Sequence, residues 1–578
     1  MATAKNKQYA NKSQNNQHHN KTVVKSQAAQ AEQSSTLREE WQKSITWWPY
    51  FITWALIMLF CTAIYGDVFT RAQQEAFVSD SPLSMQYLLN KDYGQLYWIG
   101  RFIMLVWKTT LTGSLFMATV LALATYALDR ALRMPQFLRG ISALLSWGLL
   151  LWMVFRGYSL FYKNEPSAIV LYPLFLMAGS LLLWGITALV SKLTKKDNDA
   201  TEKTEKAWSK WNVIPFILPL LFFGTLTTTT LLRNDNEILT ARMQNRLFTF
   251  DINEIGALVD DAQLAEQPSR SVAAYHAIGL IHTNQMFEGL FDIEYAYPEM
   301  KLDKKDGFEE YGVFQSDANL FSGLLNSAYR TSMDHNVMNG ATAYNLKRMA
   351  ICAILNNEPA LAEKYLTIID QMPFEGKFVE KFRAMNADRT LVELDPLFAQ
   401  ILKLVPREKR FEQNYRQPVF MGYNIGVLEG NNETLPISIA ACLYSKDFST
   451  LIERAQALKA SRGGFLPNNV LEALAIRGMS KPEVYKAFPE LNPDNQTMGN
   501  NATSTLYTFL KDIQAYYESK YSPNAWQDSL KAGIKGGVPT EVAKTLKEEW
   551  LGHYFYYYYC ENLVKKEEKS DQNNAGVN

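Results

Sequence analysis

The sequence predicts an all-α protein, in which an N-terminal bundle of five transmembrane helices is followed by a tetratricopeptide-like α-solenoid domain. Three observations predict this fold class. Residues 45–232 contain five separate apolar segments, each about as long as a bilayer crossing requires. From residue 233 onward, apolar residues recur at spacings of three and four, and strand-like alternation is scarce. Within this second part, a helix–turn–helix pattern recurs after 34 residues.

The five apolar segments are expected to be transmembrane helices in a lipid bilayer. About 20 apolar residues, each rising about 1.5 Å, cross the roughly 30 Å of hydrocarbon. Backbone N–H and C=O groups inside hydrocarbon must pair with each other, and a helix pairs them within one segment. The predicted spans are residues 45–65, 109–128, 141–161, 168–190 and 213–232.

The distribution of Lys and Arg predicts the direction of these spans. Seven of them precede the first span, three lie between the second and third, and six lie between the fourth and fifth. Because basic residues concentrate on the cytoplasmic side, we expect a cytoplasmic N-terminus and an outer C-terminal domain. The two links expected on the outer side carry fewer basic residues. They are Arg71, Lys91 and Arg101 between the first and second spans, and Arg156 and Lys163 around the link between the third and fourth spans.

Two terminal segments are expected to be disordered. Residues 1–44 are rich in Asn, Gln, Lys and Ser, so they cannot bury enough apolar surface to offset the entropy of ordering. Residues 565–578 have a similar Lys, Glu and Asn composition. The first span is too long and too far from the start for a cleaved signal peptide, so we expect an uncleaved anchor. With 58 basic and 58 acidic residues, no net positive field favours a nucleic-acid partner.

The first outer loop, residues 66–101, contains the weak candidates for catalysis. Asp67, Glu75 and Asp80 could supply an acid or hold a metal ion at the outer face, but solvated loop carboxylates are the simpler interpretation. The Ser-Pro pair at residues 81–82 predicts a short amphipathic helix at the interface. Lys108, near the start of the second span, is either a functional cation or a side chain that snorkels to the headgroups.

Residues 233–564 are expected to form stacked helix pairs. The residues Leu346, Met349 and Ala353 share one helical face, and a turn that ends in Pro359 separates them from the next helix. The pattern at residues 247–252 returns at 281–286, which is the 34-residue period of tetratricopeptide repeats. Similar turns follow Leu355 and Leu443, at longer intervals.

The last predicted helix, residues 540–564, is unusually aromatic. Six consecutive aromatic residues, 554–559, wrap round a helix, so some must pack inward. Tyr554, Tyr557 and Tyr558 are the candidates for binding a partner or stacking on a sugar ring. The alternative, which we favour, is a capping helix that seals the solenoid.

The polar motifs of several enzyme classes are absent from the sequence. It has no Cys-x-x-Cys, His-Glu-x-x-His, Gly-x-Ser-x-Gly or calcium loop, and we expect neither a cofactor nor a metal site. Cys352 and Cys442 lie on apolar faces, as buried free thiols do, and no disulfide can be assigned among them and Cys560. His276 and His282 are six residues apart, on different helix faces. A catalytic site built from distant residues stays open.

Several phrases resemble an uncharacterised bacterial family of multi-pass membrane proteins with a C-terminal helical-repeat domain. They are QYLLNKDY at residues 86–93, ALAEKYL at residues 360–366 and the closing Trp/Tyr-rich segment. The resemblance covers most of residues 45–560. It transfers no catalytic residue, and it implies a bacterial inner membrane with the outer domain in the periplasm.

These observations favour a binding scaffold over an enzyme. Stacked helix pairs present an extended concave surface that can hold a protein or an envelope component, including a glycan, without a catalytic motif. The alternative is a membrane-embedded lipid-linked sugar transferase that uses the carboxylates of the first outer loop. A transporter is less favoured, because five spans do not divide into inverted halves.

Overall fold

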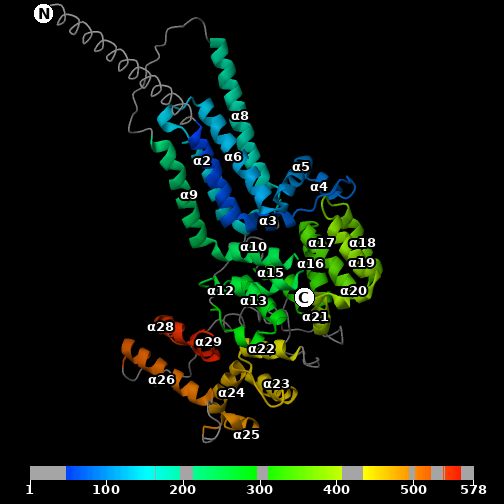
Figure 1. The fold of residues 1–578 in the computed structure, drawn as a ribbon, viewed down its shortest axis with the longest axis vertical. Coiled ribbons are helices and arrows are strands. Elements are labelled where there is room, and N and C mark those ends of the chain that lie inside the picture. Colours follow the sequence, from blue (N-terminus) through cyan, green and yellow to red (C-terminus); the bar gives the residue numbers. More distant parts are fainter. Residues whose placement is uncertain are drawn as a thin grey trace, which may run out of the picture. The chain divides into compact units, whose positions relative to one another are not determined.

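A computed structural model describes most of the chain between residues 47 and 561 (Figure 1). All regular secondary structure in the described part of the chain is helical, which confirms the all-α prediction for that part. The predicted disordered tails, 1–44 and 565–578, lie outside it. The described residues are 47–162, 164–194, 213–295, 310–405, 434–493, 502–522, 538 and 540–561.

The chain divides into two compact units, and the first contains most of the apolar helices. Four helices are long and apolar enough to cross a membrane, and a fifth is added if a pair bent by 68° counts as one span. This bent pair comprises α2 with the π-helical turn that follows it, and then α3. The apolar helices are α2 (Trp48–Leu59, then Phe60–Ile64), α6 (Thr110–Ala131), α7 (Ala143–Arg156), α8 (Ala168–Thr194) and α9 (Ile214–Arg233).

Inside the first unit, hydrogen bonds join polar side chains of different helices. The Asp129 carboxylate accepts a hydrogen bond from the Tyr50 hydroxyl at 2.7 Å and from the Gly140 backbone N–H at 2.6 Å. The Trp54 indole N–H donates to the Thr119 hydroxyl at 3.2 Å. These bonds connect α2 to α6, and α6 to the turn after it. Because an unpaired polar group in hydrocarbon costs several kcal/mol, they also stabilise this arrangement of the helices.

The second unit combines the C-terminal helices with two segments that lie between the apolar helices. Residues 64–113 and 153–171 belong to it together with residues from 230 onward. The sequence assigned both segments to the transmembrane domain, but they fold with the C-terminal helices. They contribute α3 (Gly66–Gln74), α4 (Gln86–Leu89), α5 (Gly94–Met104) and two 3₁₀ turns, η2 (Leu105–Lys108) and η4 (Gly157–Leu160).

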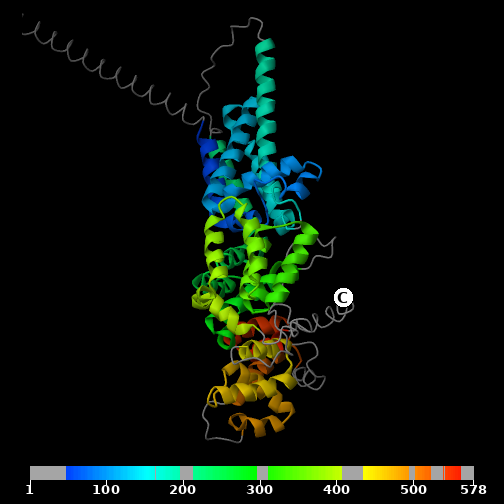
Figure 2. The same cartoon turned by 90° about the vertical axis from the view of Figure 1, so that its right-hand side faces the viewer.

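The C-terminal part of this unit is a series of helices, most of them labelled in Figure 1, and their order can be followed by colour in Figure 2. They are α10 (Asp235–Leu247), α11 (Ile252–Gly256), α12 (Leu258–Gln263), α13 (Arg270–Thr283), α14 (Met286–Gly289), α15 (Tyr311–Phe321), α16 (Leu325–Asn339), α17 (Ala343–Leu355), α18 (Pro359–Asp370), α19 (Gly376–Ala387), α20 (Arg389–Leu394), α21 (Pro396–Leu404), α22 (Leu435–Ser445), α23 (Phe448–Ser461), α24 (Asn468–Ser480), α25 (Glu483–Ala487), the 3₁₀ turn η8 (Pro489–Leu491), α26 (Ala502–Lys520), α28 (Thr540–Trp550) and α29 (Tyr554–Cys560).

The predicted helix–turn–helix joints are present, although the helices after two of them are short. α10 ends at Leu247 and α13 ends at Thr283, each just before another helix, as the 34-residue pattern indicates. However, α11 and α14 have only five and four residues, too few for the second helix of a strict tetratricopeptide pair. From α15 to α19 each helix contacts the next. The solenoid arrangement as a whole stays a prediction.

Helix α17 is enclosed by the elements packed around it in the second unit. The sequence predicts one apolar face, but all thirteen of its residues are buried. Its N-terminus is capped by Thr342, whose hydroxyl accepts from the Asn345 backbone N–H at 3.0 Å. Three polar side chains of this helix, those of Asn345, Lys347 and Arg348, are therefore enclosed and need internal partners.

Two local predictions differ from the structure. The region predicted as one helix over residues 540–564 divides into α28 and α29, because Gly552 adopts a positive φ of 95° and its N–H donates to the Phe291 carbonyl. In the first inter-span segment, the helix expected directly after residue 82 begins only at Gln86, after a turn.

Candidate functional site

A cleft of about 410 Å³ lies among the helices of the second unit. Ligand pockets commonly measure about 300–1,000 Å³, so this cleft is large enough for a small molecule or part of a peptide. It is bordered by the end of α13, by α14 and α21, by the start of α22 and by the end of α23. The described lining residues are Ile281, His282, Asn284, Met286, Phe287, Gln400, Lys403, Leu404, Pro436, Ile437, Leu458, Ser461 and Arg462.

The floor of the cleft is apolar. Met286 and Phe287 from α14, Leu404 from α21, Ile437 from α22 and Leu458 from α23 are all buried, although each also lines the opening. Four separate helices thus contribute to one surface, and none of them forms it alone. Such a floor favours an apolar group of a ligand, because it removes that group from water.

The rim of the cleft is basic. Lys403 and Arg462 are exposed there, and no Asp or Glu is among the described lining residues. The Arg462 guanidinium lies over the Phe287 ring, 5.3 Å from its centroid, and it makes no hydrogen bond or ion pair with any described residue. The ring therefore positions a guanidinium whose donors stay open toward the solvent-filled cleft.

His282 forms one wall and is held in place on both ring nitrogens. Its Nδ1 lies 3.0 Å from the side-chain oxygen of Gln400, and its Nε2 lies 2.9 Å from the Phe321 carbonyl oxygen. Burial lowers the pKa of His282, so its ring is neutral. Both ring nitrogens therefore face oxygen acceptors, and a neutral ring, which has one N–H, donates to one of them at a time. His282 is thus a fixed wall rather than a cation.

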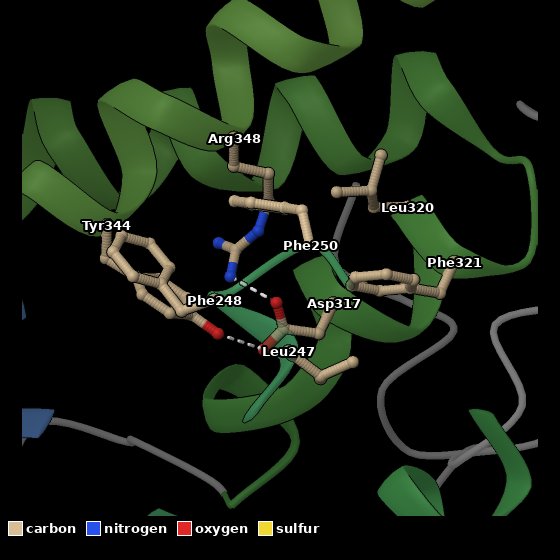
Figure 3. A pocket seen from close by; sticks show the side chains of 8 residues that line it. All are labelled: Leu247, Phe248, Phe250, Asp317, Leu320, Phe321, Tyr344 and Arg348. Atoms are coloured by element: carbon tan, nitrogen blue, oxygen red, sulfur yellow. Dashed lines mark hydrogen bonds and ion pairs between the residues drawn. The ribbon is translucent and has the colours of Figure 1, made fainter. Parts of the chain in front are cut away.

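A second cluster, formed around Asp317, is buried and has almost no free space. Figure 3 shows Arg348 and Tyr344 directed at the Asp317 carboxylate. This carboxylate accepts from the Tyr344 hydroxyl at 2.6 Å and from the Tyr275 hydroxyl at 2.9 Å, and it pairs with the Arg348 guanidinium. The adjoining cavity measures about 10 Å³, room for about one water molecule. It is a packed ionic core rather than a ligand site.

The ionic core extends from Asp317 into the inter-span segments. Arg71 of α3 pairs with Glu75, and its Nε donates to the Gln244 side-chain oxygen at 2.9 Å. The same oxygen accepts from the Tyr158 hydroxyl of η4 at 2.7 Å. The Arg71 guanidinium also lies 3.9 Å from the centroid of the Tyr344 ring. One buried network therefore joins α3 and η4 to α10, α13, α15 and α17.

Two further ion-pair groups connect the inter-span segments within the second unit. Lys108 donates from Nζ to the Phe374 carbonyl and to Glu375, each at 2.9 Å, so its charge is paired. The other Glu375 oxygen lies 2.6 Å from Lys347, whose pKa is lowered by burial. Arg101 holds both oxygens of Glu165, at 2.8 and 2.9 Å.

The three carboxylates predicted as weak catalytic candidates have separate environments. Asp67 pairs with Arg242 at 3.2 Å, and Glu75 is buried against Arg71. Asp80 is exposed. The structure therefore assigns Asp67 and Glu75 to ion pairs that connect α3 to α10 and to the ionic core.

The terminal tyrosines predicted to bind a partner face the interior to different degrees. Tyr554 and Tyr557 are buried, and their hydroxyls donate to the carbonyls of Leu443 and Tyr444, at 3.1 and 2.5 Å. Tyr558 is half-buried. These contacts attach α29 to the end of α22.

The cysteines and histidines give no evidence for metal or thiol chemistry in the part of the chain described. All four cysteines are free, and no cluster of three or more His, Cys, Asp or Glu residues there could hold a metal ion. Burial raises the pKa of Cys442 to about 12, so its thiol is not a nucleophile near neutral pH. Burial lowers the pKa of His276 to about 3, and neither of its ring nitrogens has a hydrogen-bond partner among the described residues.

The cleft was not found by sequence reasoning. The only local indication was the 34-residue pattern, whose second copy at residues 281–286 contributes one edge. Lys403 and Arg462 each lie in an ordinary amphipathic context, and nothing near them in the sequence shows that they share a rim.

Comparison with known proteins gives one match. A model described as a family of unknown function (DUF6057) matches residues 146–561, which include the whole cleft and Asp317. No curated protein matches the chain, and no solved structure does.

Proposed function

We propose that this chain, which belongs to the family of unknown function DUF6057, is a membrane-anchored binding scaffold. Its helical unit would hold a protein or a component of the cell envelope, and its apolar helices would keep that unit at the membrane. The observation that carries this proposal is the cleft of about 410 Å³, with an apolar floor and a basic rim.

The way in which the unit is built supports a scaffold rather than a loosely tethered domain. Residues 64–113 and 153–171 share one compact unit with the cleft. The buried network through Arg71, Tyr158 and Asp317 connects these segments to the C-terminal helices. Removing one partner of a buried ion pair leaves an uncompensated charge inside the protein, so separating the segments from the helices would cost several kcal/mol. A bound partner would be held at a defined position relative to the segments that lead into the spans.

The distribution of basic residues supports a proposal for the side of the membrane. Their excess before the first span and after the second and fourth spans favours a cytoplasmic N-terminus, with the helical unit on the outer side. In a Gram-negative bacterium, the anchor would be in the inner membrane and the cleft would face the periplasm.

A site-specific photo-crosslinking experiment tests the proposal in living cells. A photoreactive amino acid is introduced at Asn284 or Ser461, which are exposed and line the cleft, and at Arg330 of α16, which is exposed but does not line it. The scaffold proposal predicts a discrete adduct from Asn284 and Ser461 and none from Arg330. If the cleft positions give no adduct, or all three positions give the same one, the proposal fails.

The sugar-transferase alternative stays a prediction with its own test. Asp67 and Glu75 are held in ion pairs, so they do not favour it, and Asp80 is the one exposed carboxylate of the three. A transferase that uses Asp80 would lose its envelope glycan product in Asp80→Ala at unchanged expression. An unchanged glycan would remove this alternative for Asp80.

A further inference from the structure

We propose that the ligand of the cleft is an acidic peptide segment, with an apolar side chain on the floor and a carboxylate at Arg462. This proposal rests on the scaffold function and specifies its ligand. Peptide recognition by a groove commonly combines such an apolar pocket with charged groups at its rim.

Charge complementarity selects an acidic ligand. Lys403 and Arg462 are the only charged residues among the described lining, and both are basic. His282 adds no charge because its ring is neutral. The Arg462 guanidinium, supported by the Phe287 ring and without an acidic partner in the described part, presents the planar fork that matches a carboxylate. Among the described lining residues, a basic ligand would meet only like charges.

The polar lining selects a peptide over a lipid chain. Of the thirteen described lining residues, six are polar: His282, Asn284, Gln400, Lys403, Ser461 and Arg462. The side chains of Asn284, Gln400 and Ser461 can donate to and accept from the N–H and C=O groups of a peptide. Gln400 and Ser461 each have one partner already, His282 and the Leu458 carbonyl, and an acyl chain in the same place would leave the remaining hydrogen-bonding capacity of these side chains facing hydrocarbon, which is unfavourable.

The apolar floor selects a peptide that alternates acidic and apolar residues. Phe287, Ile437 and Leu458 are buried side chains that nonetheless line the cleft, so a leucine-sized group of the ligand would complete their packing. In an extended peptide, successive side chains point to opposite sides. One apolar residue can then enter the floor while its neighbours reach the rim.

Peptide binding to the full-length protein in detergent tests the proposal. The probe is a fluorescein-labelled hexapeptide of alternating Glu and Leu, and its anisotropy is measured. The comparison peptides carry Gln in place of Glu, or Ser in place of Leu. We expect both to bind at least about tenfold more weakly, and the affinity of the Glu/Leu peptide to fall as salt rises.

Three variants locate the binding. Arg462→Gln should weaken binding of the Glu/Leu peptide about tenfold, and Ser461→Trp should abolish it by filling the cleft. Lys481→Gln is the matched control, since Lys481 is exposed and does not line the cleft, and it should bind as the unaltered protein does. Because Arg462 and Ser461 are exposed, folding should be retained, which circular dichroism checks.

Four outcomes would overturn the proposal: equal binding of the Gln/Leu peptide, unchanged binding by Arg462→Gln, no binding of the Glu/Leu peptide, or better displacement of the probe by phosphatidylglycerol micelles than by unlabelled peptide. The scaffold function would survive any of these, provided that Asn284 and Ser461 still give a specific crosslinked adduct in cells. If both experiments fail, the scaffold function fails too.

Discussion

Replacing Asp317 by Ala should strongly destabilise the centre of the helical unit. Asp317 is 3% exposed, and its carboxylate is the only described ion-pair partner of the buried Arg348 guanidinium. Removing it leaves that guanidinium buried without a compensating negative charge among the described residues, and the hydroxyls of Tyr275 and Tyr344 lose an acceptor. Breaking a buried pair in this way costs about 3–5 kcal/mol. The paired replacement Asp317→Leu with Arg348→Met removes both charges and should cost less.

The thiol of Cys352 reports this loss directly. It lies on α17, one turn from Arg348, and is fully buried. In a protein whose other three cysteines are replaced by Ala, a thiol reagent labels Cys352 only when α17 opens. A loss of about 3–5 kcal/mol should raise the labelling rate by about 10²–10⁴-fold, since about 1.4 kcal/mol is a factor of ten.

An exposed ion pair on the neighbouring helix is the matched control. Asp334 lies 3.8 Å from Arg330, and both side chains are exposed. Because exposed pairs contribute about 0–1 kcal/mol, Asp334→Ala should change the rate less than about fivefold. Labelling of Asp317→Ala at the rate of this control would refute the conclusion that the Asp317 core holds the unit together.

Two further variants test local parts of the account. Gly323 has a φ of 83°, and an added Cβ would lie 2.6 Å from the Leu404 backbone at the edge of the cleft. Gly323→Ala should therefore lower both the melting temperature and the affinity for the peptide. Gly463 is the control, since it has a φ of 63° and no neighbour within 4 Å, so Gly463→Ala should cost only the smaller free energy of a strained φ. Equal losses of melting temperature and affinity in the two variants would contradict this. Burial raises the pKa of Glu561 from 4.5 to about 8, so between these values the folded state holds one proton more than the unfolded state. The stability contributed by this group is complete below pH 4.5 and is lost as the pH rises through about 8. The melting temperature should therefore fall between about pH 5 and about pH 8.5, and Glu561→Gln should flatten this dependence. An unchanged pH dependence in the variant would disprove the assignment.

Local patterns predicted the helices well. The apolar runs between residues 45 and 232 correspond to the apolar helices, and the turn before Pro359 correctly marks the start of α18. Helix periodicity and proline position depend on neighbours in the sequence, so one chain is enough to read them. The run of aromatics after Tyr554 hid the break at Gly552, because strong periodicity on both sides suggested one continuous helix.

The buried charges could not be predicted, because their partners are far apart in the sequence. Arg71 and Gln244 are separated by 173 positions, and Lys108 and Glu375 by 267. A polar residue on α17, such as Lys347, has the sequence context of a solvated face. Only packing by distant elements encloses that face. The cleft is hidden for the same reason, since its floor comes from four helices that no local pattern connects.

The sidedness of the helical unit is the claim on which the binding role depends most directly. In a protein without its natural cysteines, a single cysteine is introduced as Ser461→Cys at the cleft or as Ser13→Cys in the N-terminal segment. Intact spheroplasts are then treated with a membrane-impermeant maleimide. The account predicts labelling at position 461 before lysis and at position 13 only after lysis. Labelling at position 13 together with protection at position 461 in intact spheroplasts would contradict it.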